Sequence, residues 1–350
     1  MNTKFDFDDI LIQPEIITDI NSRTEVNPFY SNGFLPLITA PMDTVVNTSN
    51  CESFYNEKIN ICLPRGEQRK EKTMFQSYSL SQFKETFLYN SAQFTDEEFP
   101  LYVLIDTANG HTEDLVATVT AAKHFYEDKM VLMVGNIAHP ESYKILSNAG
   151  ADLIRIGIGN GGGCLTTQQL GIGYPMGSLI SECYAISCTL DNPAKIVADG
   201  GMKKYADIIK ALALGADYVM VGSIFNKALE SASPCYKSNN QLTGISTNPW
   251  SKISLEDAQS RLEQGLKVHK LFRGMSTKEV QKAWGNEILK TSEGIVKKQE
   301  VEYTLSGWTE NFEHYLRSAM SYTNSLTLED FIGKVKVNLI TEHAFNRFNK

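Results

Sequence analysis

The sequence lacks an apolar stretch long enough to cross a membrane. A bilayer-spanning helix needs roughly 20 predominantly apolar residues, and no segment of this 350-residue chain approaches that length. The first ten residues, MNTKFDFDDI, are acidic and lack the apolar core of a secretory signal peptide. We therefore expect a cytoplasmic protein with no membrane partner.

Clustered cysteines and histidines are also lacking. The six cysteines include no CxxC pair, and the six histidines include no HxxxH pair. Zinc sites and disulfide frameworks are usually recognised by such spacings. The sequence thus favours free thiols over disulfides or a structural zinc ion.

Runs of basic residues are scarce as well. The net charge is −8, and no dense cluster of Lys and Arg is present. Because such a surface repels polyanions on average, we expect no nucleic-acid partner. An anionic small substrate would need a local site made of backbone amides. The composition, with 42% hydrophobic and 21% charged residues, is that of a globular protein with a substantial core.

Short β-branched runs alternate with helical patterns over much of the chain. Seven runs have the length and composition of buried strands: 35–39, 59–63, 101–105, 130–134, 152–156, 195–198 and 217–221. Helical patterns occupy 113–126, 141–148, 179–189 and 203–214. Strands separated by helices in this way predict parallel βαβ units.

Glycine and polar residues follow most of these strands directly. The segments are DTANG (106–110), GN (135–136), GIGNGGGC (157–164), DGG (199–201) and GS (222–223). A doubly wound sheet needs only one or two such strand ends. The repeated pattern therefore predicts a (β/α)₈ barrel, whose active face lies at the carboxyl ends of its strands.

Residues 231–270 depart from this rhythm, since they begin with Ser, Asn, Pro and Gly and end in a helical pattern. We interpret them as an insertion or flap. No linker divides the chain, so we predict a single barrel domain over residues 1–350.

The adjacent strand ends DGG and GS have the form of a phosphate site, because glycines let backbone N–H groups converge on an anion. Each turn alone is equally consistent with a tight turn that needs positive φ. Their occurrence on consecutive strands favours phosphate binding.

Cys164 stands in the glycine-rich segment GGGCLTT. A free cysteine is most often a small buried hydrophobe. A loop of this kind offers little apolar packing but many amides that stabilise a thiolate, which is the environment of a nucleophilic cysteine. The neighbouring Thr166 and Thr167 either hydrogen-bond a reacting group or cap a helix.

Eight motifs occur in the order in which they occur in IMP dehydrogenases and GMP reductases. They are FDFDDILIQP (5–14), APMDTV (40–45), IDTANGH (105–111), VGN (134–136), GIGNGGGCLTTQQLGIGYPMGS (157–178), VADGG (197–201), VMVGS (219–223) and FRGMS (272–276). The chain resembles this family over nearly its whole length, apart from 231–270 and parts of 65–100.

The resemblance implies a (β/α)₈ barrel with a C-terminal active-site flap or extension, in which Cys164 attacks C2 of a purine nucleotide. The implied substrate-binding residues are Met42, Asn136, Asp199, Gly200, Gly201, Gly222, Ser223, Gly274, Met275, Ser276, Lys290, Ser292 and Gly294. The implied cofactor-binding residues are Ser22, Arg23, Asp106, Thr107, Ala108, Ile158, Gly159, Met275, Ser318 and Ser321. Carbonyls of Gly159, Gly161 and Cys164 match the family's loop for a monovalent cation, usually potassium.

Within the family the sequence is more similar to GMP reductases. The dehydrogenases use a flap with an Arg-Tyr dipeptide, and none of the eight arginines here precedes a tyrosine. They also usually insert CBS modules, whereas only about 35 residues separate LPRG (63–66) from LYVLI (101–105), too few for an ordinary domain. The GIGYP segment and KTSEG (290–294) resemble reductase motifs.

The reductase resemblance implies NADPH-dependent conversion of GMP to IMP, with Cys164, Thr166 and Glu293 as catalytic residues. It also implies a homotetramer in which a neighbouring subunit contributes Ser318 to the cofactor site.

Three alternatives stay open. Asn160 and Gly162 stand where the family loop has proline and serine, and Lys290 where reductases commonly have arginine. The substrate is therefore either GMP or a modified or deoxy purine nucleotide. IMP dehydrogenase-type oxidation of IMP to XMP with NAD and a non-catalytic nucleotide sensor are the other two.

Overall fold

The computed structural model describes residues 3–90, 94, 99–239, 249–275, 277, 282 and 294–348. Its central element is an eight-stranded parallel sheet in the order β2-β9-β8-β7-β6-β5-β4-β3. The strands are β2 (Leu37–Thr39), β3 (Cys62–Leu63), β4 (Phe75–Tyr78), β5 (Leu101–Asp106), β6 (Met130–Ile137), β7 (Leu153–Ile156), β8 (Lys195–Asp199) and β9 (Tyr218–Val221). Its edges meet where Ile38 pairs with Asn60. The predicted (β/α)₈ barrel is confirmed.

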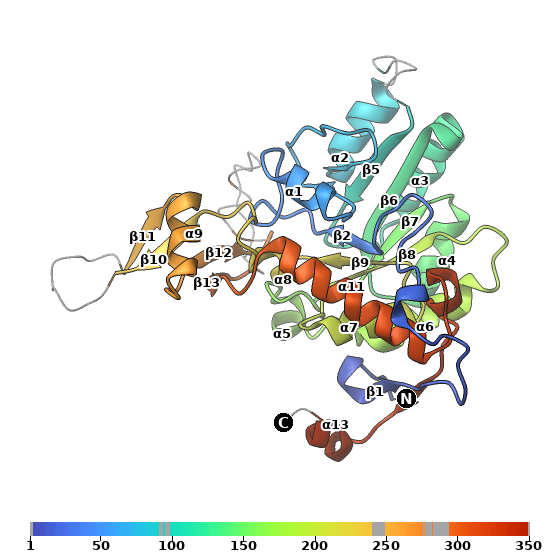
Figure 1. Ribbon diagram of the computed structural model, residues 1–350. Coiled ribbons are helices and arrows are strands. Elements are labelled where there is room, and N and C mark those ends of the chain that lie inside the picture. Colours follow the sequence, from blue (N-terminus) through green and yellow to red (C-terminus); the bar gives the residue numbers. More distant parts are fainter. Residues whose placement is uncertain are drawn as a thin grey trace.

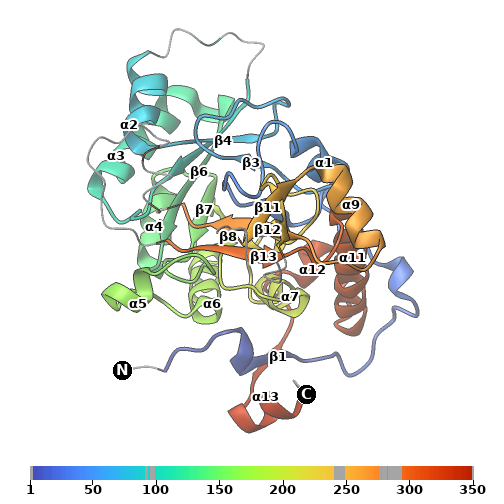
Figure 2. The same ribbon diagram turned by 90° about the vertical axis from the view of Figure 1, so that its left-hand side faces the viewer.

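Helices follow the strands, and most of them cover the outside of the barrel (Figures 1 and 2). They are α1 (Cys51–Asn56), α2 (Leu80–Phe83), α3 (Glu113–Tyr126), α4 (Pro140–Asn148), α5 (Thr166–Leu170), α6 (Met176–Ser187), α7 (Tyr205–Ala213), α8 (Ser223–Asn226), α11 (Leu305–Tyr322) and α12 (Leu328–Phe331). In the described part of the chain, none of the helices is long and apolar enough to cross a bilayer.

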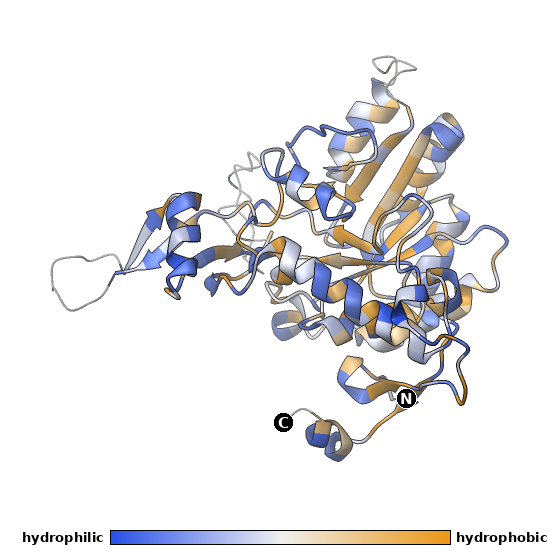
Figure 3. Ribbon diagram, viewed as in Figure 1, coloured by the Kyte–Doolittle hydropathy of each residue, from blue (hydrophilic) through white to orange (hydrophobic). Residues whose placement is uncertain are grey.

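Two apolar layers hold the barrel together. Alternate strand residues face inward, and the inner cluster consists of Ile38, Ala40, Cys62, Phe75, Leu104, Met133, Leu153, Val197 and Met220. Residues on the opposite strand faces, such as Ile154, pack beneath the helices. The hydrophobic colouring of the central strands in Figure 3 reflects this double burial. Since Arg155 is two residues beyond Leu153, it shares the inner face, close to the carboxyl end of β7.

The seven predicted strands all correspond to barrel strands, but the eighth, β4, was not predicted. Its sequence, FQSY, has polar residues at both central positions, so it lacks an apolar run. Phe75 and Ser77 are buried, and Ser77 donates a hydrogen bond to the Leu63 carbonyl at 2.6 Å. A polar residue inside the barrel is thus satisfied by the neighbouring strand.

The described residues 235–238, 250–253 and 269–270 contribute to an antiparallel sheet in the order β11-β10-β12-β13, while the interpretation of 231–270 as an insertion or flap stays a prediction. The elements are β10 (Cys235–Ser238), β11 (Trp250–Ile253), α9 (Leu255–Glu263), β12 (His269–Arg273) and β13 (Val296–Glu300). This sheet projects from the barrel in Figure 1. It has its own small core of Leu229, Cys235, Ala258, Val268 and Val301. Strand β13, which lies beyond residue 270, belongs to the same sheet.

The two ends of the described chain meet on another side of the barrel. Strand β1 (Ile10–Ile12) pairs antiparallel with β14 (Val337–Leu339), and α13 (Glu342–Phe348) follows. The prediction that residues 1–350 form a single domain stays a prediction.

Candidate active site at the barrel mouth

Cys164 lies in the loop between β7 and α5. Its backbone N–H donates to the Gly161 carbonyl at 2.9 Å, which closes a tight turn, and its sulfur lies 3.2 Å from Thr166 Oγ1. The side chain is partly exposed, whereas Cys51, Cys62, Cys183 and Cys235 are buried. All six cysteines are free thiols. Cys164 thus combines access with a hydroxyl partner.

The two threonines that follow have different surroundings. Thr166 is the first residue of α5, and Leu165 rather than either threonine is at the N-cap. Thr167 donates its hydroxyl to the Ile172 carbonyl at 2.9 Å, within the same loop. Thr167 therefore stabilises the loop conformation, while Thr166 points to the thiol.

Close backbone packing brings the glycine-rich loop onto neighbouring strand ends. A Cβ atom on Gly200 would lie 2.8 Å from the Gly161 nitrogen, and one on Gly163 would lie 2.7 Å from the Phe272 ring. Beside them, the exposed Gly162 has room, since its Cβ would be 3.6 Å from Ser223 Oγ. The loop after β7 therefore meets the segments after β8 and β9 and strand β12.

The C-terminal segment contributes a backbone clamp. Cys164 forms a bridge with Gly294, and the Ile295 N–H donates to the Gly163 carbonyl at 3.1 Å. The Gly274 N–H donates to the Ile295 carbonyl at 3.0 Å, which places the Gly274–Met275 segment beside the same loop. Four predicted site residues, Ser276, Lys290, Ser292 and Glu293, lie outside the described residues.

The predicted base and phosphate residues also meet. Gly222 is the N-cap of α8, directly before Ser223, and a Cβ atom on Gly222 would lie 3.0 Å from Met42 Sδ. Gly200 and Gly201 follow β8 with φ of 88° and 93°, values that favour glycine. The loops after β2, β8 and β9 thus converge on one side of Cys164.

A buried charged network occupies the inner mouth of the barrel, next to these loops. Arg155 donates to Asp106 Oδ1 at 2.9 Å and to Asp199 Oδ2 at 2.8 Å. Asn136 Nδ2 donates to the same Asp199 oxygen at 2.7 Å and to the Gly157 carbonyl at 2.8 Å. Although burial opposes its charge, the two carboxylates raise the pKa of Arg155. The guanidinium is therefore a permanent cation in the site.

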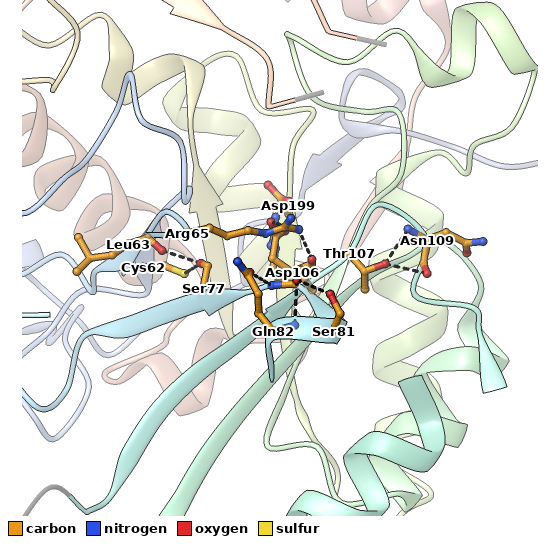
Figure 4. A network of polar contacts seen from close by, with 12 residues as sticks. Cys62, Leu63, Arg65, Ser77, Ser81, Gln82, Asp106, Thr107, Asn109 and Asp199 are labelled. Carbon is orange, nitrogen blue, oxygen red and sulfur yellow. Dashed lines mark hydrogen bonds and ion pairs between the residues drawn. The ribbon is translucent and has the colours of Figure 1, made fainter. Parts of the chain in front are cut away.

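Arg65 completes this network from the end of β3. One of its nitrogens lies 3.0 Å from Asp106 Oδ2, and Figure 4 shows Arg65, Asp106 and Asp199 gathered at one point. The sequence reasoning assigned Asp106 and Asp199 but missed the role of Arg155. A charged residue inside the apolar run DLIRI was the available signal, because a buried arginine needs partners.

The predicted cofactor residues fall into two groups. Asp106 ends β5 and Thr107 and Ala108 follow it, and the Thr107 N–H donates to the Gly135 carbonyl at 2.8 Å. Ile158 and Gly159 lie in the Cys164 loop, where a Cβ atom on Gly159 would overlap Thr167. These residues belong to the barrel mouth.

The second group lies between helix α11 and the short helix at Arg23–Glu25. Arg23 Nη1 is 3.5 Å from Ser318 Oγ, Ser22 caps the short helix, and Ser321 donates to the Ser318 carbonyl. Among the described residues, none of these side chains is hydrogen-bonded to the Cys164 loop.

A metal site made of acidic, histidine or cysteine side chains is absent from the described residues. The predicted cation loop would instead use carbonyls. The Gly161 carbonyl already accepts the Cys164 N–H, so one of its two lone pairs is engaged.

Comparisons with known proteins point to one family. Residues 93–348 match the model of the IMP dehydrogenase / GMP reductase domain. The GMP reductase of Buchnera aphidicola subsp. Schizaphis graminum is 27% identical over an alignment 370 residues long. The alignment covers 99% of this chain and 97% of that protein. The GMP reductase of Staphylococcus saprophyticus is 32% identical over 240 residues, with 65% and 72% covered.

The Caenorhabditis elegans GMP reductase is 25% identical over 366 residues, covering 97% of this chain and 93% of that protein. The family model alone spans more than half of the chain. On this basis, and with the barrel and its cysteine loop in place, the chain belongs to the IMP dehydrogenase / GMP reductase domain family.

Proposed function

We propose that this protein is an NADPH-dependent GMP reductase, which converts GMP to IMP and ammonia through a covalent thioimidate on Cys164. The observation that carries the proposal is the partly exposed Cys164 thiol with its Thr166 partner, on a loop that meets two glycine-rich strand ends. The names of the related proteins support the same activity.

In the proposed reaction the Cys164 thiolate attacks C2 of guanine and forms a carbon–sulfur bond. The bond from C2 to the amino group then breaks, and Glu293 with Thr166 supplies the proton, so that ammonia leaves. NADPH, when bound, supplies the hydride that C2 receives in place of sulfur. Cys164 is regenerated as a thiolate, and one GMP, one NADPH and one proton become IMP, NADP⁺ and ammonia.

The role of Glu293 is supported by its neighbour in the chain. Gly294 pairs with Cys164, and consecutive Cα atoms are about 3.8 Å apart. A carboxyl group on this segment is therefore a suitable acid for a group that leaves from C2. Glu293 itself lies outside the described residues.

The nucleotide would be held by groups that converge beside Cys164. Asp199 offers a carboxylate to the ribose, Gly222 and Ser223 offer donors to the phosphate at the start of α8, and Met42 offers an apolar surface to the base. Asp199 is already oriented by Arg155 and Asn136. A preoriented carboxylate lowers the entropic cost of binding.

The residues present fit a dinucleotide cofactor. Asp106 ends β5 and Thr107 and Ala108 follow it at the barrel mouth, while Arg23, whose Nη1 lies 3.5 Å from Ser318 Oγ, offers a guanidinium suited to a phosphate. The residues at the end of β5 and the Arg23–Ser318 group lie in separate regions of one chain. This supports a homotetramer in which a neighbouring subunit supplies the Arg23–Ser318 group. We place this oligomer in the cytoplasm, with one barrel domain per subunit.

The residues present also fit a monovalent cation. Carbonyl oxygens are the preferred ligands of hard cations, and Gly159, Gly161 and Cys164 would supply them. A bound potassium ion would hold the Cys164 loop in one conformation. Activity should then be higher in potassium than in lithium salts at equal ionic strength.

One observation favours a second candidate, in which the substrate is a modified or deoxy purine nucleotide. Gly162 stands where the family loop has serine, yet a Cβ atom there would make only ordinary contacts with Ser223. Packing does not impose glycine at this position. The missing hydroxyl therefore fits a change in how the phosphate side of the substrate is bound.

The test is a turnover assay that follows the near-ultraviolet absorbance of NADPH. Loss of NADPH with GMP, accompanied by ammonia, is the expected result. NADH formation from NAD and IMP would instead indicate dehydrogenase activity. Tight nucleotide binding without turnover in either direction would indicate a sensor, and dGMP in parallel tests the second candidate.

A further inference from the structure

Asn226 is a fully buried polar residue outside every motif considered above. It is the last residue of α8, four positions after Gly222, and its side chain is 0% exposed. Its backbone N–H donates to the Gly222 carbonyl at 2.9 Å. It is therefore anchored to the turn assigned to the substrate phosphate.

The side-chain amide of Asn226 links two other substrate loops. Nδ2 donates to the Thr44 carbonyl at 2.9 Å and to the Leu271 carbonyl at 3.1 Å. Thr44 is two residues after Met42, and Leu271 is three residues before Gly274. Both acceptors are carbonyl oxygens, so the donor must be the amide nitrogen.

The side-chain oxygen of Asn226 indicates that packing alone does not account for an asparagine at this position. Asn226 Oδ1 is buried, and none of the described residues donates a hydrogen bond to it. An unpaired buried oxygen is costly. An apolar side chain would avoid that cost, and what it would lose is the pair of donated bonds.

Two further sets of contacts join the same segments that the Asn226 side chain joins. Ser233 donates its N–H to the Thr44 carbonyl at 3.2 Å and accepts the Leu271 N–H on its hydroxyl at 2.7 Å. Arg273 forms an ion pair with Asp43. Residues 43–44 and 271–273 are thus joined at three points, which we call the β2–β12 seam.

We propose that Asn226 is a positioning residue that fixes the spacing between Met42 and the Gly274–Met275 segment, and with it the width of the purine slot. The inference rests on the proposed function, in which Met42 contacts the base, and on the family resemblance, which assigns Gly274 and Met275 to the same substrate. Because the Asn226 backbone is hydrogen-bonded to the Gly222 carbonyl, its side chain connects the base contacts to the phosphate turn.

The test compares nucleotide binding by the full-length wild type and Asn226→Ala, measured by titration calorimetry with GMP and IMP and by steady-state kinetics. We expect the Kd and the KM for GMP to rise about tenfold, as for the loss of roughly 1.4 kcal/mol of binding free energy. The KM for NADPH should change by less than about twofold. Asn226→Asp, which keeps the shape but removes the donors, should weaken GMP binding at least as much.

Asn60 provides a matched control. Its Nδ2 also donates to two carbonyls, those of Leu35 and Leu37, each at 3.0 Å, before and within β2 and away from the seam. Asn60→Ala should lower the melting temperature without weakening GMP binding. Equal weakening in Asn60→Ala and Asn226→Ala would reduce the effect to general destabilisation and overturn the proposal.

The remaining outcomes separate the two proposals. If the wild type binds GMP and Asn226→Ala binds it equally well, the role of Asn226 is wrong and the proposed function stands. If the wild type binds neither GMP nor IMP, the proposed function is wrong, and the role of Asn226 fails with it. Should Asn226→Asp not fold, Asn226→Ala still decides.

Discussion

The sulfur of Cys164 lies 3.2 Å from the hydroxyl oxygen of Thr166, within one turn of the loop that follows β7. The hydroxyl is close enough to relay a proton to or from a group bonded at the sulfur.

Thr166→Val removes the hydroxyl but keeps a β-branched side chain. We expect kcat for GMP to fall about 10²-fold, the usual contribution of a positioned proton donor, with little change in the KM for GMP. Rapid-quench measurement of ammonia release checks this. Thr166→Ser should recover most of the rate, and an unchanged kcat in Thr166→Val would contradict the assignment.

Gly162 and Gly163 form a matched pair of substitutions. A methyl group on Gly163 would meet the buried Phe272 ring at 2.7 Å, whereas on Gly162 it has 3.6 Å to Ser223. Gly163→Ala should lower kcat/KM for GMP more than about tenfold, because a misplaced nucleophile loses near-attack geometry. Gly162→Ala should stay close to wild type, and Gly162→Ser should lower the KM for GMP because it restores a hydroxyl donor beside Ser223. Similar activities for the two alanine variants would refute this reading of the loop.

His111 predicts a pH dependence of stability. Burial, with the nearby His139, lowers the pKa of His111, and its Nε2 accepts the Ala138 N–H at 3.0 Å. The unfolded chain then binds more protons than the folded one at pH values below about 6.5. Stability should therefore fall as the pH drops through that region, down to the folded-state pKa. Urea midpoints of His111→Gln should depend less on pH than those of wild type, with exposed His124→Gln as control; parallel curves for all three proteins would rule the effect out.

Shared active sites can be tested by complementation. If a neighbouring subunit supplies Arg23 and Ser318 to the cofactor, co-expressed Cys164→Ala and Arg23→Glu chains will form mixed oligomers that contain some intact sites. Partial recovery of NADPH oxidation is expected where each variant alone is inactive. The control is size-exclusion chromatography of differently tagged chains, and mixed oligomers without recovered activity would show that the groups act within one chain or not at all.

The sequence was sufficient for the barrel because most of its strands are continuous apolar runs with glycine at their ends. Strand β4 was missed because Ser77 is satisfied by a neighbouring strand, a long-range contact that no local pattern records. The antiparallel sheet escaped prediction for a similar reason, since Cys235, Val268 and Val301 form one core from separated segments.

The residues of the candidate site also differ in whether a local sequence pattern identifies them. Cys164, Asp199 and Gly222 stand in motifs with local signals, and the structure brings their loops together. The partners of Arg155 lie 44 and 49 residues away in the sequence. Those of the Asn226 side chain lie 45 and 182 residues away. Such pairings depend on which strand ends meet when the barrel closes.

The network around Arg155 has a consequence for how an acidic protein admits an anionic ligand. Arg65 and Arg155 carry two positive charges, and Asp106 and Asp199 carry two negative charges, so the four groups sum to zero. The chain as a whole is at −8, but surface charges further than about 8 Å away are largely screened at physiological ionic strength. A nucleotide that binds at the barrel mouth therefore meets four charged side chains whose net charge is zero. The overall negative charge of the protein does not repel the substrate from this site.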